Sequence, residues 1–163
     1  MTKVFIGGSR NIKGINDKIK KHLDNIINKQ YQVLIGDSYG ADRAVQQYLH
    51  EVYYRNVAVY YSGEKCRNNL GHWKVINIPV PADLKRDEFY AIKDKSMARA
   101  ADWGFMLWDG KSSGTLSNIF NILSSNKIVL LYYSPKKQFY TITKAEDIQE
   151  LLEKYRKAGF KKL

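Results

Sequence analysis

Short apolar segments and segments of helical periodicity alternate along this chain. Apolar runs bounded by polar or glycine residues have the length and composition of strands buried in a sheet. Such strands are predicted at Lys3–Gly7, Tyr31–Ile35, Asn56–Tyr61, Trp103–Trp108 and Lys127–Tyr133, with an edge strand at Gln138–Ile142. Val75–Ile78 is either a further short strand or an extended piece of chain that leads to Pro79.

Apolar residues three and four positions apart predict a helix after most of these strands. The helices are predicted at about Asn16–Lys29, Ala41–Tyr54, Arg86–Ala101, Thr115–Ser125 and Lys144–Ala158. The face of the third helix that packs against the sheet is predicted from a repeat of four residues: Phe89, Ile92, Met97 and Ala100.

Strands that alternate with helices form βαβ units, and such units build a mostly parallel sheet with helices on both faces. The sequence therefore predicts a Rossmann-like, doubly wound α/β fold. A length of 163 residues is typical of a single domain, which we expect to span 1–163. The segment at about 62–85 is predicted to be irregular, and it contains Pro79 and Pro81.

Three of the predicted strands end in glycine-rich turns. Gly7–Arg10 follows the first strand, Gly36–Gly40 follows the second, and Gly110–Gly114 follows Trp103–Trp108. In open parallel sheets, ligands bind outside the carboxyl ends of the strands. Glycine turns and helix N-termini present backbone N–H groups that hold anions. The three turns together therefore predict a pocket for a ligand that carries phosphate.

The candidate ligand-binding residues come from these turns and from the first part of the helix after the third turn. The Arg10 guanidinium is expected to neutralise charge on the ligand, and Asn118 lies one helical turn beyond Thr115. The full set is Gly7, Gly8, Ser9, Arg10, Gly36, Ser38, Asp109, Gly110, Ser112, Ser113, Gly114, Thr115 and Asn118.

Carboxylates near the predicted turns have more than one interpretation. Asp109 lies at the carboxyl end of its strand and is expected to contact ribose, whereas Asp102 at the opposite end is expected to stabilise a turn. Asp42 lies in the first turn of its helix, where a carboxylate caps the helix dipole. Arg43 beside it either pairs with Asp37 or faces a ligand.

Several well-known functional motifs are absent from the sequence. There is no GxGxxG fingerprint, no GxxxxGK[ST] loop and no HExxH. His22 and His50 lie in predicted helices without a partner at metal-ligand spacing, and Cys66 is the only cysteine. We therefore predict no metal and no cofactor. His72 is a weaker ligand candidate, and Trp108 is expected in the core rather than against a base.

The chain is basic, with 27 lysine and arginine residues against 16 acidic residues and a net charge of +11. Such a charge favours anionic ligands or polyanionic partners, although many of the lysines are expected only to solvate the C-terminal helix. No apolar run approaches the roughly 18 residues that cross a bilayer. The first strand begins at once, without the features of a signal peptide. The protein is expected to be cytoplasmic, without a membrane partner.

These turns resemble a known superfamily. The segments Gly7–Arg10, Gly36–Arg43, Ala101–Asp102 and Trp108–Thr115 look like those of the SLOG superfamily. This superfamily includes the cytokinin-activating LOG phosphoribohydrolases and the DNA-processing protein A. The phrases G-x-x-x-GAD-R and WDGKS-x-GT are most similar to the small bacterial and phage members, and the resemblance covers about Lys3–Tyr133.

The resemblance implies a Rossmann-like fold that binds nucleotides or nucleotide-derived signals such as ADP-ribose-type molecules. It places the phosphate of the ligand at Gly110–Thr115, with Gly7–Arg10 in the same pocket, and it implies a homodimer. One departure affects the expected activity. LOG-type hydrolases have a glutamate three residues after the threonine of GGxGTxxE, and this chain has Asn118 there. An amide cannot act as a general base.

Three functions stay open at this point. The first is a sensor or binding protein for a nucleotide or nucleotide-derived molecule, in which Asp109 and Asn118 contact ribose or base. The second is a LOG-like hydrolase or transferase that acts on the N-glycosidic bond of nucleoside monophosphates through an unidentified residue. The third is single-stranded nucleic-acid binding, favoured by the charge and by tyrosines among lysines, such as Tyr132, Tyr133 and Tyr140.

Overall fold

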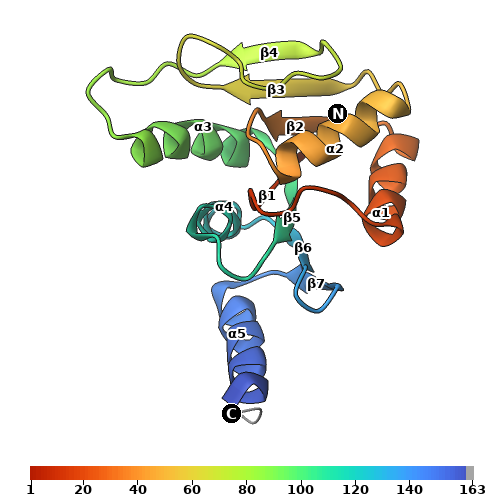
Figure 1. Cartoon of the computed structure of the whole chain (residues 1–163), viewed down its shortest axis with the longest axis vertical. Coiled ribbons are helices and arrows are strands. Elements are labelled where there is room, and N and C mark those ends of the chain that lie inside the picture. The colour runs from red at the N-terminus through yellow and green to blue at the C-terminus, as the bar shows by residue number, and fades with distance from the viewer. Residues whose placement is uncertain (161–163) are drawn as a thin grey trace.

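A computed structural model of the chain describes residues 1–160, with side chains as far as Arg156. Its elements, in chain order, are β1 (Lys3–Gly8), α1 (Asp17–Asn28), β2 (Gln32–Gly36), α2 (Ala41–Glu51), β3 (Val57–Tyr61), β4 (Lys74–Asn77), α3 (Arg86–Ala100), β5 (Trp103–Trp108), α4 (Ser113–Ser124), β6 (Val129–Tyr133), β7 (Gln138–Ile142) and α5 (Ala145–Phe160). Figure 1 shows them as a tall, narrow stack of strands flanked by helices.

The sheet has seven strands in the order β4-β3-β2-β1-β5-β6-β7. Every neighbouring pair is parallel except β6 and β7, which are antiparallel. The chain begins at β1, moves outward to β4, and then returns to place β5 on the other side of β1. The predicted mostly parallel sheet is therefore confirmed, and its strand order reverses between β1 and β5.

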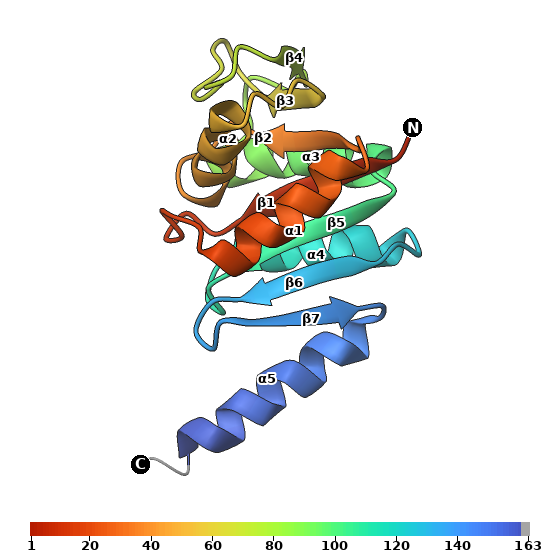
Figure 2. The same ribbon diagram turned by 90° about the vertical axis from the view of Figure 1, so that its right-hand side faces the viewer.

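Helices cover both faces of the sheet, as the doubly wound fold requires. In Figure 1, α1 and α2 lie on one side of the strands, and α3 and α4 lie on the other. Figure 2 shows α1 crossing in front of the sheet, with α5 below the edge strand β7. Successive side chains of β1 point to opposite faces of the sheet, so a core forms on each face. Val4 and Ile6 belong to the core under α1 and α2, whereas Phe5 belongs to the core on the opposite face.

Some boundaries differ from those predicted. α2 ends at Glu51 rather than near Tyr54, because Tyr53 has a φ of 58° that a helix cannot continue through. α4 begins at Ser113, two residues earlier than predicted, since the Ser112 side chain accepts the N–H of Thr115 as an N-cap. The extended piece near Val75 is a strand, β4, paired with β3. No helix within the described residues is long and apolar enough to cross a membrane.

The predicted inward face of α3 is wrong. The structure buries Met97 as expected, but its companions are Lys93 and Ala98. Phe89 and Ile92 are only partly buried. The helix therefore presents a charged residue toward the interior of the protein, which an apolar periodicity cannot predict.

Candidate functional site

A cavity of about 660 Å³ opens at the carboxyl ends of the strands, beside the point where the strand order reverses between β1 and β5. Its walls come from the turns after β1, β2 and β5 and from the facing sides of α3 and α4. The lining residues are Phe5, Gly7, Gly8, Arg10, Asn11, Ser38, Asp42, Asp87, Tyr90, Ala91, Lys93, Asp94, Met97, Asp109, Lys111, Ser112, Ser113, Gly114, Thr115, Ser117, Asn118 and Asn121. Such crevices at switch points are where doubly wound sheets bind ligands.

Most of the predicted site residues meet at this cavity. Those that line it are Gly7, Gly8, Arg10, Ser38, Asp109, Ser112, Ser113, Gly114, Thr115 and Asn118. Three others do not. Ser9 is buried beneath the residues that line the cavity. Gly36 lies next to the Asp42 carboxyl and the Lys93 ammonium. Gly110 has a φ of 80° and lies next to the ring of Tyr133. These three shape the turns rather than face the cavity.

Ser9 joins the turn after β1 to the turn after β5. Its Oγ donates to Asp109 Oδ1 at 3.2 Å and accepts the Asp109 N–H at 3.1 Å. The same oxygen lies 3.2 Å from Thr115 Oγ1. Ser9 is only 1 % exposed, and its hydrogen bonds to Asp109 and Thr115 fix the two turns relative to each other.

The carboxylate of Asp109 accepts hydrogen bonds from its own turn and from the turn after β1. Its Oδ1 accepts the N–H groups of Lys111 and Ser112 at 2.9 and 2.8 Å, and Oδ2 accepts Asn11 Nδ2 at 3.3 Å. Burial alone would raise the pKa of Asp109, but the hydrogen bonds from Ser112, Lys111 and Ser9 hold it below its ordinary value. Asp109 thus braces the loop that leads into α4 through Oδ1, while Oδ2 accepts a single hydrogen bond among the described residues and the side chain lines the cavity.

The first turn of α4 supplies the free hydrogen-bond donors of the site. Ser112 satisfies the N–H of Thr115 at 3.2 Å. Among the described residues, the N–H groups of Ser113 and Gly114 have no acceptor. Uncapped N–H groups at a helix N-terminus carry partial positive charge and bind anions. Lys111, which also lines the cavity, adds a full positive charge nearby.

The turn after β2 is held against the turn after β1. Gly40 is the N-cap of α2 and has a φ of 82° and a ψ of −128°. A Cβ at this position would lie 2.4 Å from the backbone of Arg10. The Ala41 N–H donates to the Ser9 carbonyl at 3.2 Å. This close approach places Arg10 at the mouth of the cavity, where its guanidinium lies 5.9 Å from the centre of the Tyr90 ring.

A charged cluster beside the cavity was not predicted. Asp37 is 1 % exposed and forms a bidentate salt bridge with Arg67. Arg67 Nη2 donates to Asp37 Oδ1 at 2.7 Å, and Arg67 Nε donates to Asp37 Oδ2 at 3.1 Å. Arg67, and not Arg43, is therefore the partner of Asp37. Arg43 donates to Asn68 Oδ1 at 2.7 Å instead. The guanidinium of Arg67 also lies 4.3 Å from the centre of the Tyr90 ring, which ties this cluster to α3.

Lys93 is the centre of the buried charges. Its side chain is 3 % exposed, and its ammonium lies 3.5 Å from Asp37 Oδ1 and 3.6 Å from Asp94 Oδ1. Gly36 makes room for this arrangement, because a Cβ there would lie 2.6 Å from Asp42 Oδ2 and 3.0 Å from Lys93 Nζ. A buried ammonium is stable only among carboxylates or other acceptors, which explains why three aspartates surround it.

Two of those aspartates have pKa values displaced toward neutrality. Burial raises the pKa of Asp42 to about 7, and the neighbouring Asp94 and Asp37 add to the rise while Lys93 opposes it. Asp42 accepts one hydrogen bond, from the Ser38 N–H at 3.2 Å. Burial likewise raises the pKa of Asp94, against the opposing effects of Lys93 and of a hydrogen bond with Asn118. Shifted carboxyls in a cavity are a frequent mark of a functional site.

The sequence contains a partial signal for these residues. Tyr90, Lys93 and Asp94 are three and four positions apart, so they form a polar stripe on one side of α3. Such a stripe usually marks a solvated face, and only the position of α4 shows that it is interior. Arg67 lies in the irregular segment, where no periodicity predicts its direction.

Other predicted side chains lie away from the cavity. Trp108 is 2 % exposed and donates to the Ser112 carbonyl at 3.0 Å, which confirms it as a core residue. Asp102 accepts the Lys3 N–H at 2.7 Å, a contact that holds the start of β1. His72 is exposed and does not line the cavity. Within residues 1–160, no three His, Cys, Asp or Glu side chains gather as metal ligands would.

Comparison with known proteins adds no family assignment. No protein-family model matches this chain, and a search of curated proteins found no significant match. The functional argument therefore depends on the cavity itself.

Proposed function

We propose that this protein binds a nucleotide or a nucleotide-derived small molecule, as a sensor or binding protein related to the SLOG superfamily. A nucleoside phosphate or an ADP-ribose-like molecule fits this proposal. Its phosphate binds at the start of α4, and its sugar and base extend toward α3. The cavity volume of about 660 Å³ is within the range of small-molecule sites.

The observation that carries the proposal is the first turn of α4. The N–H groups of Ser113 and Gly114, which have no acceptor within the described residues, face a cavity at the switch point of the sheet. Arg10 and Lys111 line the same cavity and provide charge for a phosphate. Neutral small molecules would leave these donors and charges unused, so an anionic ligand is favoured.

Nucleic-acid binding is less well supported. Tyr132 and Tyr133, two of the tyrosines on which that interpretation depends, are 4 % and 9 % exposed. Their rings belong to the two cores and offer no face on which a base can stack. A homodimer and a cytoplasmic location remain predictions.

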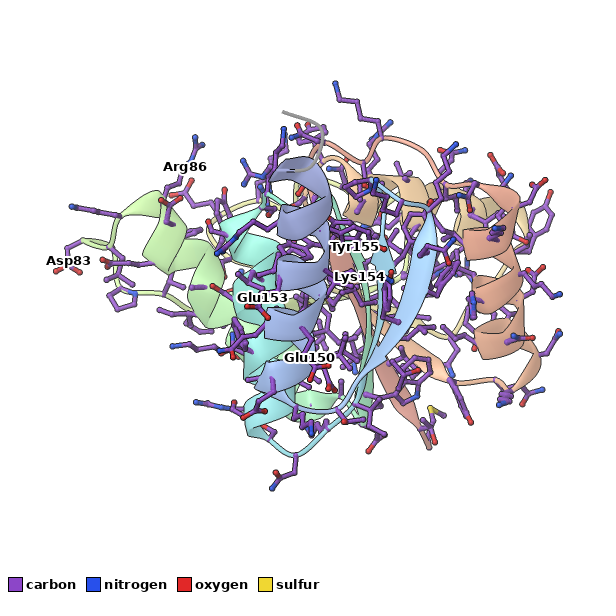
Figure 3. The ribbon with its side chains drawn as sticks, turned by 90° about the horizontal axis from the view of Figure 1, so that it is seen from below. Asp83, Arg86, Glu150, Glu153, Lys154 and Tyr155 are labelled. Atoms are coloured by element: carbon purple, nitrogen blue, oxygen red, sulfur yellow. The ribbon has the colours of Figure 1, made fainter. Side chains whose placement is uncertain are left out.

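Arg10→Ala is expected to weaken nucleotide binding about tenfold, because a charge-assisted hydrogen bond to phosphate contributes about 1.5 kcal/mol or more. Isothermal titration calorimetry measures this with the nucleoside 5′-monophosphates of the four common bases and with ADP-ribose. Arg86→Ala is the matched control, since Arg86 is exposed, does not line the cavity and projects from the outer end of α3 (Figure 3). Binding of none of these ligands to the folded protein would refute the proposal.

A further inference from the structure

One aromatic side chain is presented to the cavity from α3. Of the described residues that line the cavity, Phe5 and Tyr90 are the aromatic ones. Phe5 is 1 % exposed and belongs to the core on this face of the sheet, so its ring has no free face for a ligand. Tyr90 is only partly buried. It is therefore the aromatic side chain that a ligand in the cavity can reach.

Arg67 holds the Tyr90 ring from the side that faces away from the cavity. The Arg67 guanidinium lies 4.3 Å from the ring centre, within the range of a cation–π contact. Arg67 is not one of the described residues that line the cavity, so the ring lies between this guanidinium and the cavity. The Phe89 ring supports Tyr90 in an edge-to-face contact, with 5.3 Å between the ring centres. One face of Tyr90 is thus covered, and the other is left for the cavity.

The cations around the ring are themselves held by carboxylates. Besides the bidentate salt bridge of Arg67 with Asp37, the Arg67 N–H donates to Asp37 Oδ2 at 2.9 Å. The Lys93 ammonium, at 5.5 Å from the centre of the Tyr90 ring, lies closer to the carboxylates of Asp37 and Asp94, at 3.5 and 3.6 Å. A ring that is already ordered by fixed neighbours loses little freedom when a ligand stacks on it, so less binding energy is lost to ordering.

We propose that the cavity-facing side of Tyr90 stacks on the base of the bound nucleotide and makes the site selective for ligands that carry a planar base. This inference rests on the proposed function, because it requires the phosphate to be held by the first turn of α4. Arg10, which provides charge for that phosphate, has its guanidinium 5.9 Å from the centre of the Tyr90 ring. The phosphate contacts and the aromatic ring therefore belong to one cavity and can act on one ligand.

This contact determines the kind of selectivity that the site has. Every base has a flat face, so stacking on Tyr90 distinguishes a nucleotide from a sugar phosphate rather than one base from another. A purine covers more of the phenol ring than a pyrimidine does, and the gain from burial is roughly proportional to the area removed from water. Purine nucleotides are therefore expected to bind more tightly than pyrimidine nucleotides, and all four more tightly than the sugar phosphate alone.

The test is calorimetric titration with the four nucleoside 5′-monophosphates and with ribose 5-phosphate, which has the same sugar and phosphate without a base. Tyr90→Ala is expected to weaken nucleotide binding about tenfold or more, the usual size of a base–aromatic stacking contribution, and to leave the affinity for ribose 5-phosphate within a few-fold of wild type. Tyr90→Phe keeps the ring and should bind both kinds of ligand as wild type does. Tyr39→Ala is the matched control, because Tyr39 is 59 % exposed and does not line the cavity.

The pair of ligands separates stacking from a loss of structure, since a distorted site would weaken both ligands alike. If Tyr90→Ala does not fold, Tyr90→Leu provides the same comparison, because leucine fills the space without a planar ring. Nucleotide binding that is equally tight in wild type and Tyr90→Ala overturns this inference and leaves the proposed function intact. An equal loss for nucleotide and ribose 5-phosphate also overturns it, as does a wild-type protein that does not prefer nucleotides to ribose 5-phosphate. Failure to bind any nucleotide refutes both proposals.

Discussion

Gly114→Asp is expected to remove nucleotide binding without harming the fold. Gly114 is the second residue of α4, and a Cβ there would meet nothing closer than Ser112 Oγ at 3.9 Å. An aspartate in the first turn of a helix is stabilised by the dipole, and replacement of a helical glycine is favourable by itself. The melting temperature should therefore stay the same or rise slightly.

The carboxylate that Gly114→Asp introduces would occupy the place proposed for the phosphate. Repulsion between the two anions should cost about 3 kcal/mol, or about 100-fold in affinity. Gly114→Ala is the control, since it adds the Cβ without charge and should bind within a few-fold of wild type. If the folded Gly114→Asp protein bound nucleotide as tightly as wild type, the phosphate would have to lie elsewhere.

Gly40→Ala is expected to be strongly destabilising. The backbone of Gly40, at φ 82° and ψ −128°, is in a region that residues with a Cβ avoid. The new Cβ would also lie 2.4 Å from the Cα and carbonyl oxygen of Arg10, so the turns after β1 and β2 would have to separate. We expect a loss of about 3 kcal/mol in the free energy of unfolding, or about 10 °C in melting temperature.

Urea denaturation and thermal melting measure this effect. Gly14→Ala is the matched control, because its Cβ would meet no atom within 4 Å and its φ is not positive. That variant should be as stable as wild type or slightly more stable. Equal stability of the two variants would mean that the contact between Gly40 and Arg10 does not hold the turns together.

The fold could be predicted because its signals are local. Each central strand is a short apolar run, and each helix repeats its apolar residues at helical spacing, so the order of elements follows from the sequence. The three glycine turns could be placed at one edge because parallel strands share a direction. The network of Ser9 with Asp109 and Thr115 shows that two of these turns do meet.

The charged part of the site could not be predicted for a physical reason. Lys93 and Asp94 lie on a helix whose apolar repeat indicates a different inward face, and their burial depends on where α4 lies. Arg67 reaches Asp37 across 30 positions of sequence from a segment without periodicity. The sequence also did not predict that Oδ1 of Asp109 accepts the N–H groups of Lys111 and Ser112. Contacts of this kind depend on tertiary geometry alone.

The central claim is that a nucleotide phosphate binds at the first turn of α4. The most direct test is an amide proton–nitrogen NMR spectrum recorded while a nucleoside 5′-monophosphate or ADP-ribose is added. The N–H signals of Ser113 and Gly114 are expected to move most, followed by those of Gly8 and Arg10, in one saturable step. Signals in these turns that stay in place at millimolar nucleotide, or shifts confined to another part of the protein, would contradict the claim.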